Sequence, residues 1–473
     1  MINLTVLHIN DLHGRVSQLV RIATLVRKIR QEVEAEGGYC LFVDAGDSED
    51  TTLLESSLTK GSAMEAILRG AGCQYVALGN AIPGRYGPQA IANLAKAFGR
   101  PLLCANMKDE SGRLVEGLEP FSIITMGSLK VGLIGLTAPN DSYTSFFKLK
   151  MDQPEDILPG LVTEVRAQGA QTVLLLSHLS STADQTLAEK VAGMDVIIGA
   201  HDHKDIDPPL IVKDTVIAQA GDLGRLLGRL DLKIDPDTGN VLQHKGKLIP
   251  ITIAIPLDPA TQKAVETEQE RAHEMMNREI GILTESVELR DDRECAAGNL
   301  LADALLERVK EAQLSLILSG HWQTGLDAGV LTQGTLFTAN RSTANPARAE
   351  LTGEQILSFL RAALKPENAA RKLGPLRGRA VGMPHIAGAC VRYRDDLEQI
   401  EVEIDGRQLE EERRYIVAST DMEFAEYINY LVIPFEQMEF EVPTIMPEVL
   451  EDYITKHSPI QKPEAGRILI RAK

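Results

Sequence analysis

Cysteine is scarce in this sequence and is not paired. The 473 residues contain five cysteines, an odd number, and no two of them are spaced as Cys-x-x-Cys. A disulfide framework needs paired cysteines and a zinc ribbon needs closely spaced pairs, so both kinds of scaffold are excluded. We expect these residues to be buried as small hydrophobic side chains. They are Cys40, Cys73, Cys104, Cys295 and Cys390.

The sequence also lacks a long hydrophobic run. No stretch of about 18 uninterrupted apolar residues is present, so no transmembrane helix is expected. The chain opens on MINLTVLHINDLHG, a strand-like run. A secretory signal peptide would instead open on a basic stretch and an apolar core of about 7–15 residues. If Met1 is the natural start, we expect a cytoplasmic protein. A chain whose signal had been removed would read the same.

Positive charge is in deficit. The chain has 49 Lys and Arg against 67 Asp and Glu, a formal net charge of −18. So acidic a chain has no general attraction for nucleic acid or anionic membranes. We therefore expect neither as a partner, and a nuclease is disfavoured. With 44% hydrophobic and 25% charged residues the composition is that of a globular protein, which excludes disorder. The length predicts two or three domains.

The first half alternates short apolar runs with amphipathic stretches, which predicts an α/β layered domain. The runs are rich in Val, Ile and Leu, as buried strands are. The expected strands are Leu4–Ile9, Tyr39–Val43, Tyr75–Leu78, Pro101–Ala105, Val131–Leu136, Thr172–Leu176 and Val196–Ile198. The expected helices between them include Gln18–Glu34, Pro88–Phe98 and Pro159–Gln168.

The texture of the sequence changes after about residue 250. The stretch Ala260–Ile280 is highly charged and free of Gly and Pro, which predicts a mostly solvated linker helix. A helix at Ala297–Lys310 and turn-broken, β-rich sequence follow it. We therefore predict a first domain at 1–250, a linker at 251–283 and a second domain at 284–473.

Polar residues stand directly after the expected strands of the first half. Such loops gather at one edge of an α/β sheet, where ligands bind. The clusters are Asp11-Leu12-His13, Asp44-Ala45-Gly46-Asp47, Gly79-Asn80, Ser177-His178 and His201-Asp202-His203.

These residue types suit a pair of divalent cations. Imidazole, carboxylate and amide oxygen ligands fit transition metals, and two ions about 3.5–4 Å apart need a bridging ligand. Each motif alone can be explained without a metal, as a turn, a surface histidine pair or a core histidine. Their joint occurrence, in order and each after a strand, favours a metal site.

With these residues in view, the sequence resembles the calcineurin-like metallophosphoesterases, and more narrowly the two-domain bacterial 5′-nucleotidase type. The motifs are LHINDLHG, DAGD, LGN, LLSHL and GAHDH, and the segments VGLIGLTAP and QAGDLGRLLGRLDL look similar as well. The resemblance implies an α/β and α+β protein. A four-layer metallophosphoesterase sandwich would be followed by a 5′-nucleotidase-type α+β domain that binds substrate.

The resemblance also implies the metal ligands and the reaction. Two divalent ions of Mn, Zn, Fe, Co or Ni would assist in-line attack of water on phosphorus. Asp44 fits a role in orienting the turn or a ligand. One ion would be held by Asp11, His13 and His203 and the other by Asn80, His178 and His201, with Asp47 as the bridge.

The sequence departs from the family after the ligand Asn80. The family continues with a histidine that assists the transition state or the leaving group, and here Ala81 takes its place. Loss of one positioned acid–base group costs about 10²–10⁴-fold in rate. Slow hydrolysis that depends on the leaving group and full inactivity are both compatible with this change. Arg85 is a catalytic candidate near the phosphoryl oxygens, or else a solvated loop arginine.

The second half matches the substrate-binding motifs only in part. The family's Ser-Gly-Gly-Ile-Arg segment resembles Ser319–Gln323, so an arginine becomes Gln323. The two aromatics that would sandwich a base are missing. Trp322 is a candidate replacement or a core residue, and Tyr427 and Tyr430 are further candidates. The predicted substrate contacts are Gln323, Trp322, Arg290 and Arg293, the two arginines being solvated in the alternative reading.

The leading expectation is a dinuclear-metal phosphoesterase that hydrolyses a small phosphorylated, nucleotide-like metabolite. The alternative is a catalytically impaired relative that binds metal and ligand as a sensor.

Overall fold

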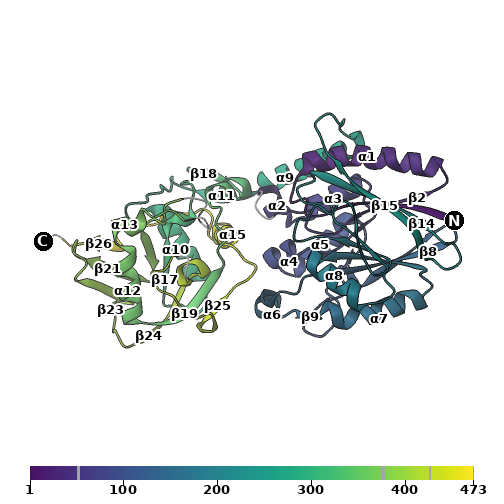
Figure 1. Cartoon of the computed structure of the whole chain (residues 1–473). Coiled ribbons are helices and arrows are strands. Elements are labelled where there is room, and N and C mark those ends of the chain that lie inside the picture. Colours follow the sequence, from purple (N-terminus) through teal and green to yellow (C-terminus); the bar gives the residue numbers. More distant parts are fainter. Residues whose placement is uncertain (51–53, 374–375, 377–378, 426–427, 472–473) are drawn as a thin grey trace. The chain divides into compact units, whose positions relative to one another are not determined.

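The computed structural model describes residues 1–50, 54–373, 376, 379–425 and 428–471. It divides into two compact units, Met1–Ala272 and His273–Lys473, and the division falls inside the linker expected at 251–283 (Figure 1). Within the described ranges, no helix is both long and apolar enough to cross a bilayer.

The first unit contains a five-stranded sheet in the order β15-β14-β1-β2-β3. The strands β1, β2 and β3 are parallel, and β14 and β15 add an antiparallel hairpin. The bounds are β1 Ile2–Ile9, β2 Tyr39–Asp44, β3 Tyr75–Val76, β14 Leu226–Ile234 and β15 Val241–Pro250.

A second, six-stranded sheet has the order β12-β13-β11-β10-β8-β7. Its middle strands β8, β10, β11 and β13 are parallel. The bounds are β7 Phe121–Met126, β8 Leu129–Thr137, β10 Thr172–His178, β11 Val196–Gly199, β12 Leu210–Val212 and β13 Thr215–Ala218. Two small ribbons pair β4 Leu102–Leu103 with β6 Leu118–Glu119 and β5 Met107–Lys108 with β9 Lys150–Met151.

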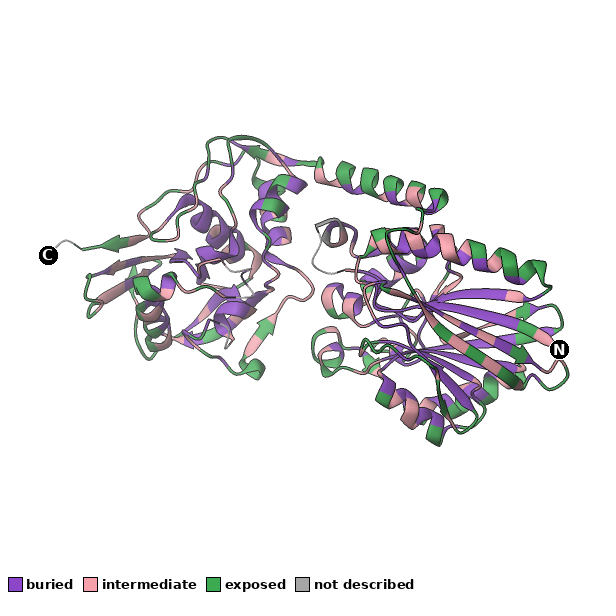
Figure 2. Ribbon diagram, turned by 45° about the horizontal axis from the view of Figure 1, so that its top comes forward, coloured by how far each residue is buried: buried purple, intermediate pink, exposed green. Residues whose placement is uncertain are grey.

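The two sheets and their helices form four layers, as expected for the first domain. In β1, Leu4 and Val6 pack into the core between the sheets, whereas Leu7 and Ile9 pack under the outer helices. Because both faces of these strands are buried, they are apolar throughout instead of alternating (Figure 2). The helices are α1 Val16–Ala35, α2 Leu54–Thr59, α3 Ser62–Gly70, α4 Ala81–Tyr86, α5 Gln89–Phe98, α6 Asp141–Phe147, α7 Pro154–Ala167, α8 Ser181–Lys190 and α9 Pro259–Met276.

The second unit is of the α+β type, again as expected. Its main sheet has the order β20-β17-β24-β19-β25, and a smaller one has the order β23-β22-β21-β26. The strands are β16 Glu279–Leu283, β17 Leu314–Leu318, β18 Gly329–Thr332, β19 Pro346–Thr352, β20 Pro384–Ala387, β21 Ala389–Tyr393, β22 Ile400–Ile404, β23 Arg407–Gln408, β24 Arg414–Thr420, β25 Met438–Phe440 and β26 Ile468–Ile470. The helices are α10 Ala296–Arg308, η1 Ser319–His321, α11 Gln333–Ala339, α12 Gly353–Ala363, α13 Pro366–Ala369, α14 Asp421–Phe424, η2 Phe435–Gln437 and α15 Met446–His457.

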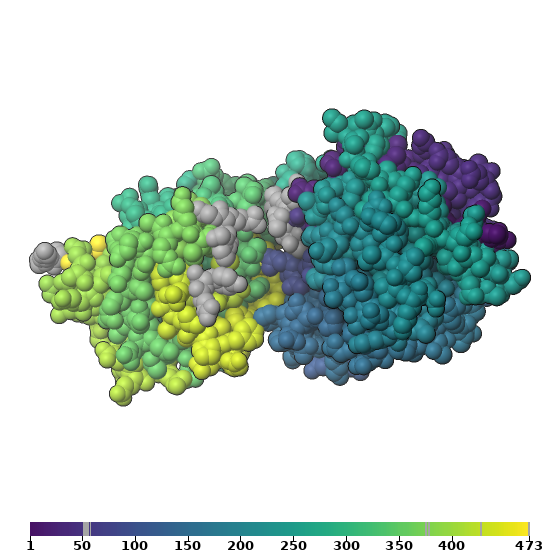
Figure 3. All heavy atoms as spheres, viewed as in Figure 1, coloured from purple at the N-terminus to yellow at the C-terminus, as the bar shows by residue number. Residues whose placement is uncertain are grey.

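Each unit has its own apolar core. Figure 3 shows one face of the molecule with all heavy atoms drawn as spheres. The core of the second unit surrounds α10, whose residues Leu300, Leu301 and Leu305 are fully buried. This explains why the helix shows little amphipathic pattern in the sequence.

Several predicted bounds differ from the structure. The helix expected from Pro159 begins at Pro154, because proline is well suited to the first helical turn, where its missing N–H has no partner to lose. The charged linker helix ends at Met276, and Ile280 belongs instead to β16, which pairs with β18. The run Pro101–Ala105 keeps only the two-residue strand β4. The β14–β15 hairpin was not expected, because β15 is half-exposed and polar.

Candidate metal centre

The predicted metal ligands all follow, or end, parallel strands of the two sheets. The loops after β1 and β2 are joined by backbone hydrogen bonds, in which Asp11 N–H donates to the Gly46 carbonyl (2.9 Å) and His13 N–H to the Asp47 carbonyl (3.1 Å). We call this set the candidate metal centre. Its members are Asp11, His13, Asp47, Asn80, His178, His201 and His203.

Five of these seven residues have left-handed backbones. A positive φ is uncommon outside glycine because it raises the conformational energy of the backbone. A cluster of such residues therefore marks a site where the direction of the side chains offsets this energy. The φ angles are 48° for Asp11, 45° for His13, 54° for Asp47, 79° for His201 and 58° for His203.

Asp11, His13 and His203 form one group that could hold a metal ion, with ligand atoms within 4.8 Å of one another. The Asp11 Oδ2 atom is occupied: it accepts hydrogen bonds from Asn10 Nδ2 (2.8 Å) and from the His201 backbone N–H (2.9 Å). Its Oδ1 atom is buried without a hydrogen-bond partner and lies 3.4 Å from His203 Nε2 and 3.8 Å from His13 Nε2. This orphaned carboxylate oxygen fits a cation.

Asp47, His178 and Asn80 form a second cluster. His178 Nδ1 lies 3.0 Å from the Ala45 carbonyl, which can only accept, so Nδ1 carries the proton. The other ring nitrogen, Nε2, then faces Asp47 Oδ2 at 3.2 Å and Asn80 Oδ1 at 2.9 Å. Three electron-rich atoms in a buried site need a positive charge among them, so this cluster also fits a cation. The His201 ring lies beside the His178 ring, with centroids 5.1 Å apart and the ring planes tilted by 58°.

The ionisation of these side chains reflects the same need for charge balance. Burial disfavours charge on His178, but the neighbouring Asp47 carboxylate outweighs this and raises the pKa of His178 to about 9. Burial likewise opposes ionisation of Asp47, yet His178 and the Ala81 N–H hold its pKa below the usual value. Behind them, burial raises the pKa of Asp44 to about 7.

Two carboxylates, those of Asp11 and Asp47, lie close enough together to share a candidate ligand group. Asp11 also falls within ligand distance of Asp47 and His178, so Asp11 is common to both candidate groups. The bridging role of Asp47 stays a prediction. The His178 side chain is fully buried, whereas 28% of His13 and 42% of His203 are exposed, so the centre is reached from the side of these two histidines.

The segment after Asn80 forms the short helix α4. Its first residue, Ala81, donates its backbone N–H to Asp47 Oδ1 at 2.9 Å. The Tyr143 hydroxyl donates to the Asn80 carbonyl at 3.0 Å and so fixes the ligand's backbone. Arg85 is half-buried on the same helix, with its guanidinium carbon 5.6 Å from the ring of Tyr86. A catalytic role for Arg85 stays a prediction.

Two supporting residues were not identified from the sequence. Asn10 is buried and orients Asp11, and its position before a ligand was the only signal available. Gly79 lies so close to Asp47 that a Cβ at this position would overlap the carboxylate. The glycine next to a ligand in the LGN motif was a signal for close approach.

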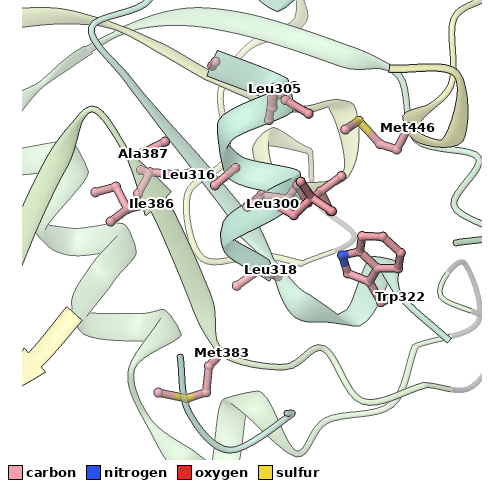
Figure 4. Close-up of a cluster of buried hydrophobic side chains, with 14 of the residues drawn as sticks. Leu300, Leu305, Leu316, Leu318, Trp322, Met383, Ile386, Ala387 and Met446 are labelled. Atoms are coloured by element: carbon pink, nitrogen blue, oxygen red, sulfur yellow. The ribbon is translucent and has the colours of Figure 1, made fainter. Parts of the chain in front are cut away.

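In the second unit, Trp322 is part of the core. It has no exposed surface and lies among Leu300, Leu318 and Met446 (Figure 4). The ring is therefore not presented to a ligand, and the core reading replaces the expectation that it binds substrate. Tyr430 is also buried, packed edge-on against Phe359 with centroids 5.7 Å apart. Tyr427 lies outside the described residues.

The remaining predicted substrate contacts lie on neighbouring loops. Gln323 is half-buried, and Arg290 and Arg293 are exposed. Arg379 joins the two segments, because it donates to Asp291 Oδ1 at 2.7 Å and to the Trp322 carbonyl at 3.2 Å. This link was not visible in the sequence. The substrate roles of Gln323, Arg290 and Arg293 stay predictions.

A buried polar network joins the Ser319–Gln323 segment to the loops that carry Ser342 and Glu423. His321 bonds to Ser342 Oγ at 2.6 Å through Nδ1 and to Glu423 Oε1 at 2.8 Å through Nε2. Thr420 donates to the other oxygen of Glu423. All four residues are buried, so this network holds the loops rigidly where the sequence lacks an aromatic clamp.

Comparisons with known proteins agree with both halves of this description. A family model described as calcineurin-like phosphoesterase matches residues 4–205. A second model, described as 5′-nucleotidase, C-terminal domain, matches residues 278–430. The two matches fall in the two compact units.

Relatives extend over most of the chain. An uncharacterized metallophosphoesterase, YunD of Bacillus subtilis (strain 168), is 26% identical over 94% of this chain and 97% of its own length. The 5′-nucleotidase of Bos taurus is 27% identical over 64% of this chain, which spans only 59% of that protein. The crystal structure of a 5′-nucleotidase precursor from Thermus thermophilus covers all of this chain, at 22% identity and a TM-score of 0.54. Residues 4–205 therefore belong to the calcineurin-like phosphoesterases, a family of phosphoric ester hydrolases, and residues 278–430 form a 5′-nucleotidase C-terminal domain.

Proposed function

We propose that this protein is a dinuclear-metal phosphoesterase that hydrolyses a small phosphorylated, nucleotide-like metabolite. The observation that carries the proposal is the candidate metal centre, where each of two clusters brings electron-rich ligand atoms close together. In the first cluster the key atom is the unpartnered Asp11 Oδ1. In the second cluster His178 Nε2 lies beside the Asp47 carboxylate.

The donor set fits two divalent ions of Mn, Zn, Fe, Co or Ni, since it combines imidazole, carboxylate and amide oxygen. When bound, such ions neutralise charge on a phosphoryl group and lower the pKa of a bound water. In our assignment Asp47 serves both ions. One ion is held by Asp11, His13 and His203, and the other by Asn80, His178 and His201.

The chain's own residues preset this centre. The Ala45 carbonyl fixes the His178 tautomer, so that Nε2 is the free ligand atom. Asn10 and the His201 N–H occupy Asp11 Oδ2, so that Oδ1 is free. The Ala81 side chain cannot donate a proton, so a leaving group must take its proton from another source. Arg85 can offer positive charge near the leaving group, but it does not give up a proton at neutral pH. We therefore expect turnover to favour good leaving groups.

The substrate class is proposed from the second unit. The 5′-nucleotidase C-terminal match and the bovine 5′-nucleotidase support a nucleotide-like molecule. Gln323, Arg290 and Arg293 supply polar and cationic contacts, but the buried Trp322 offers no ring for stacking. Base–aromatic stacking is worth about 1–3 kcal/mol per base, so we expect the phosphate and sugar to dominate recognition.

A second candidate function is a sensor that binds metal and ligand without efficient catalysis. The observation in its favour is Ala81 at the start of α4, where the rebuilt loop carries no acid–base side chain in the family's position.

Turnover of an activated aryl phosphate with Mn²⁺ tests the proposal. We expect measurable hydrolysis that Asp47→Asn abolishes, whereas Asp214→Asn, at an exposed carboxylate, leaves the rate unchanged. Metal analysis should find two ions per chain, fewer in His201→Ala. Bound metal without turnover of any compound in a broad phosphate panel would favour the sensor. A protein that binds no metal would contradict both functions.

A further inference from the structure

The segment that follows β13 touches both loops of the first metal-ligand group. It runs from Gln219 to Leu223 and is the start of the QAGDLG motif, to which the proposed function assigns no role. Gln219 is fully buried although its side chain is polar. Its Nε2 is hydrogen-bonded, whereas its Oε1 is buried without a partner, so the contact made by Nε2 is the one that favours this placement of the amide.

Gln219 holds the turn that carries His201 and His203. Its Nε2 donates to Asp202 Oδ1 at 3.0 Å. The other oxygen of Asp202 accepts from the Ser181 backbone N–H at 3.0 Å and from Ser181 Oγ at 2.5 Å. The Asp202 carboxylate, which stands between the two histidines in the sequence, is therefore hydrogen-bonded to Ser181 of α8 and to Gln219 after β13. It makes these bonds outside the candidate metal centre.

This engagement matters because the turn is strained. His201 and His203 both have positive φ, 79° and 58°, while Asp202 stands between them. A turn with two left-handed non-glycine residues persists only where its surroundings hold it. The three hydrogen bonds to Asp202 hold the turn, together with the bond from the His201 N–H to Asp11 Oδ2.

The same segment also holds Asp11. The Ala220 N–H donates to Asn10 Oδ1 (2.9 Å), and Asn10 Nδ2 donates to the Gly221 carbonyl (2.5 Å) as well as to Asp11 Oδ2. The Leu223 N–H donates to the Asp11 carbonyl at 2.8 Å. One short segment therefore fixes the loops of Asp11 and of His203.

We propose that Gln219–Leu223 is a clasp that presets the ligands of one metal ion, and that Gln219 is its positioning residue. The inference rests on the proposed function, since it assumes that Asp11, His13 and His203 bind an ion. Of the other ion's predicted ligands, Asn80 and His178 receive none of the contacts described above, and His201 is held in addition by its own N–H bond to Asp11 Oδ2. Loosening the clasp therefore weakens mainly the site that includes His203.

The test compares Gln219→Leu with Thr215→Val. The leucine keeps the volume but removes the donor to Asp202. Thr215 is the first residue of β13, the strand that precedes Gln219, and its replacement by valine removes a buried hydrogen bond to the Met194 carbonyl (3.0 Å). Mn²⁺ is titrated calorimetrically into metal-free protein, the bound ions are followed by electron paramagnetic resonance, and melting of the metal-free protein is recorded.

We expect wild type and Thr215→Val to bind two Mn²⁺ ions. Gln219→Leu should bind one ion normally and the other about 10–100-fold more weakly, as is typical when a partner that orients a ligand is lost. Its metal-free protein should melt no lower than Thr215→Val. Hydrogen exchange over residues 199–206 should be faster by about tenfold in Gln219→Leu alone, a readout independent of metal.

Two tight ions with unchanged exchange in Gln219→Leu would overturn the clasp and leave the proposed function standing. Parallel weakening of both ions, with lower melting than the control, would reduce Gln219 to a general structural role. A wild-type protein that binds no Mn²⁺ would overturn the proposed function, and the clasp with it.

Discussion

At the scale of single residues, the candidate metal centre depends on how closely the chain can approach itself. Gly79 and Asp47 are in contact across the loops after β3 and β2, and the neighbouring Gly46 lies against the His178 ring in the same way. Small residues here let carboxylate and imidazole groups converge without backbone clashes. The glycines of the DAGD and LGN motifs are thus part of the site.

Gly79→Ala should abolish tight metal binding, because the added methyl would overlap the Asp47 carboxylate and its backbone N–H. Gly160→Ala is the matched control, since a Cβ there meets nothing within 4 Å and Gly160 lies inside α7. The control should be stabilised by about 0.5–1 kcal/mol. Metal analysis and melting of both variants check the prediction. Full metal content in Gly79→Ala would show that the loop can shift at little cost.

Ala81→His tests the missing acid–base group. The histidine should raise the rate for alkyl phosphates more than for aryl phosphates, because a basic alkoxide needs a proton and an activated aryl oxide does not. The gain should stay below the 10²–10⁴-fold that a well-placed acid supplies, since no partner orients the new ring. Steady-state rates with one ester of each kind measure it. Equal or lower rates with both esters would mean that α4 points the side chain elsewhere, or that another group already assists departure.

At the scale of elements, the start of α10 depends on an uncharged histidine. His385 of β20 is fully buried, accepts the Cys295 N–H at Nε2 (2.9 Å) and donates from Nδ1 to the Met383 carbonyl (3.0 Å). Burial lowers the pKa of His385 to about 4. Protonation of His385 Nε2 would place its N–H opposite the Cys295 N–H at the start of α10, so that two donors would face each other.

The second unit should therefore lose stability in mild acid. The unfolded histidine takes up a proton below about pH 6.5, whereas the folded one stays neutral down to about pH 4, so stability falls as the pH falls through this window. At pH 5 the loss amounts to about 2 kcal/mol. Urea unfolding followed by fluorescence of Trp322, the sole tryptophan, reports on this unit. His385→Gln should be less stable at neutral pH and lose about 2 kcal/mol less on acidification. An equal acid loss in both proteins would assign the effect to other groups.

At the scale of the whole molecule, chemistry and recognition fall to different units in the proposed function. The candidate metal centre is built entirely within Met1–Ala272, and the predicted substrate contacts all stand within His273–Lys473. The net charge of −18 acts on the molecule as a whole and opposes approach of anionic substrates at long range. Recognition therefore depends on local cations and on the metal ions.

Discrimination among nucleobases should be weak. If the protein hydrolyses nucleotides, kcat/KM for AMP, GMP and UMP should differ by less than about tenfold, or about 1.4 kcal/mol. The reason is that Trp322 is buried and Gln323 stands where the family has an arginine. Parallel assays of the three nucleotides with one enzyme preparation measure this. A strong preference for one base would reveal a stacking surface elsewhere in the chain.

The sequence alone predicted the alternation of strands and helices in the first unit and the α+β character of the second. It could do so because runs such as Thr172–Leu176 are buried on both faces, and burial leaves an apolar run in any sequence context. It missed the β14–β15 hairpin, since a half-exposed edge strand such as β15 carries no such run. The seven candidate ligands were predicted from the family resemblance of short motifs that follow or end buried strands.

Tertiary structure alone decided how those ligands are held and which aromatic is available. Gln219 and Ser181 reach the turn of His201 and His203 from the end of β13 and from α8, and Asn10 connects Asp11 to Gly221. Contacts between residues so far apart along the chain leave no local pattern. Trp322 could equally face a ligand or a core in its sequence context. Trp322 faces the core because α10 and α15 pack around it, and this packing depends on residues remote in the sequence. Short motifs indicate which side chains are chemically suited to a site, whereas the burial and orientation of those side chains depend on the assembled fold.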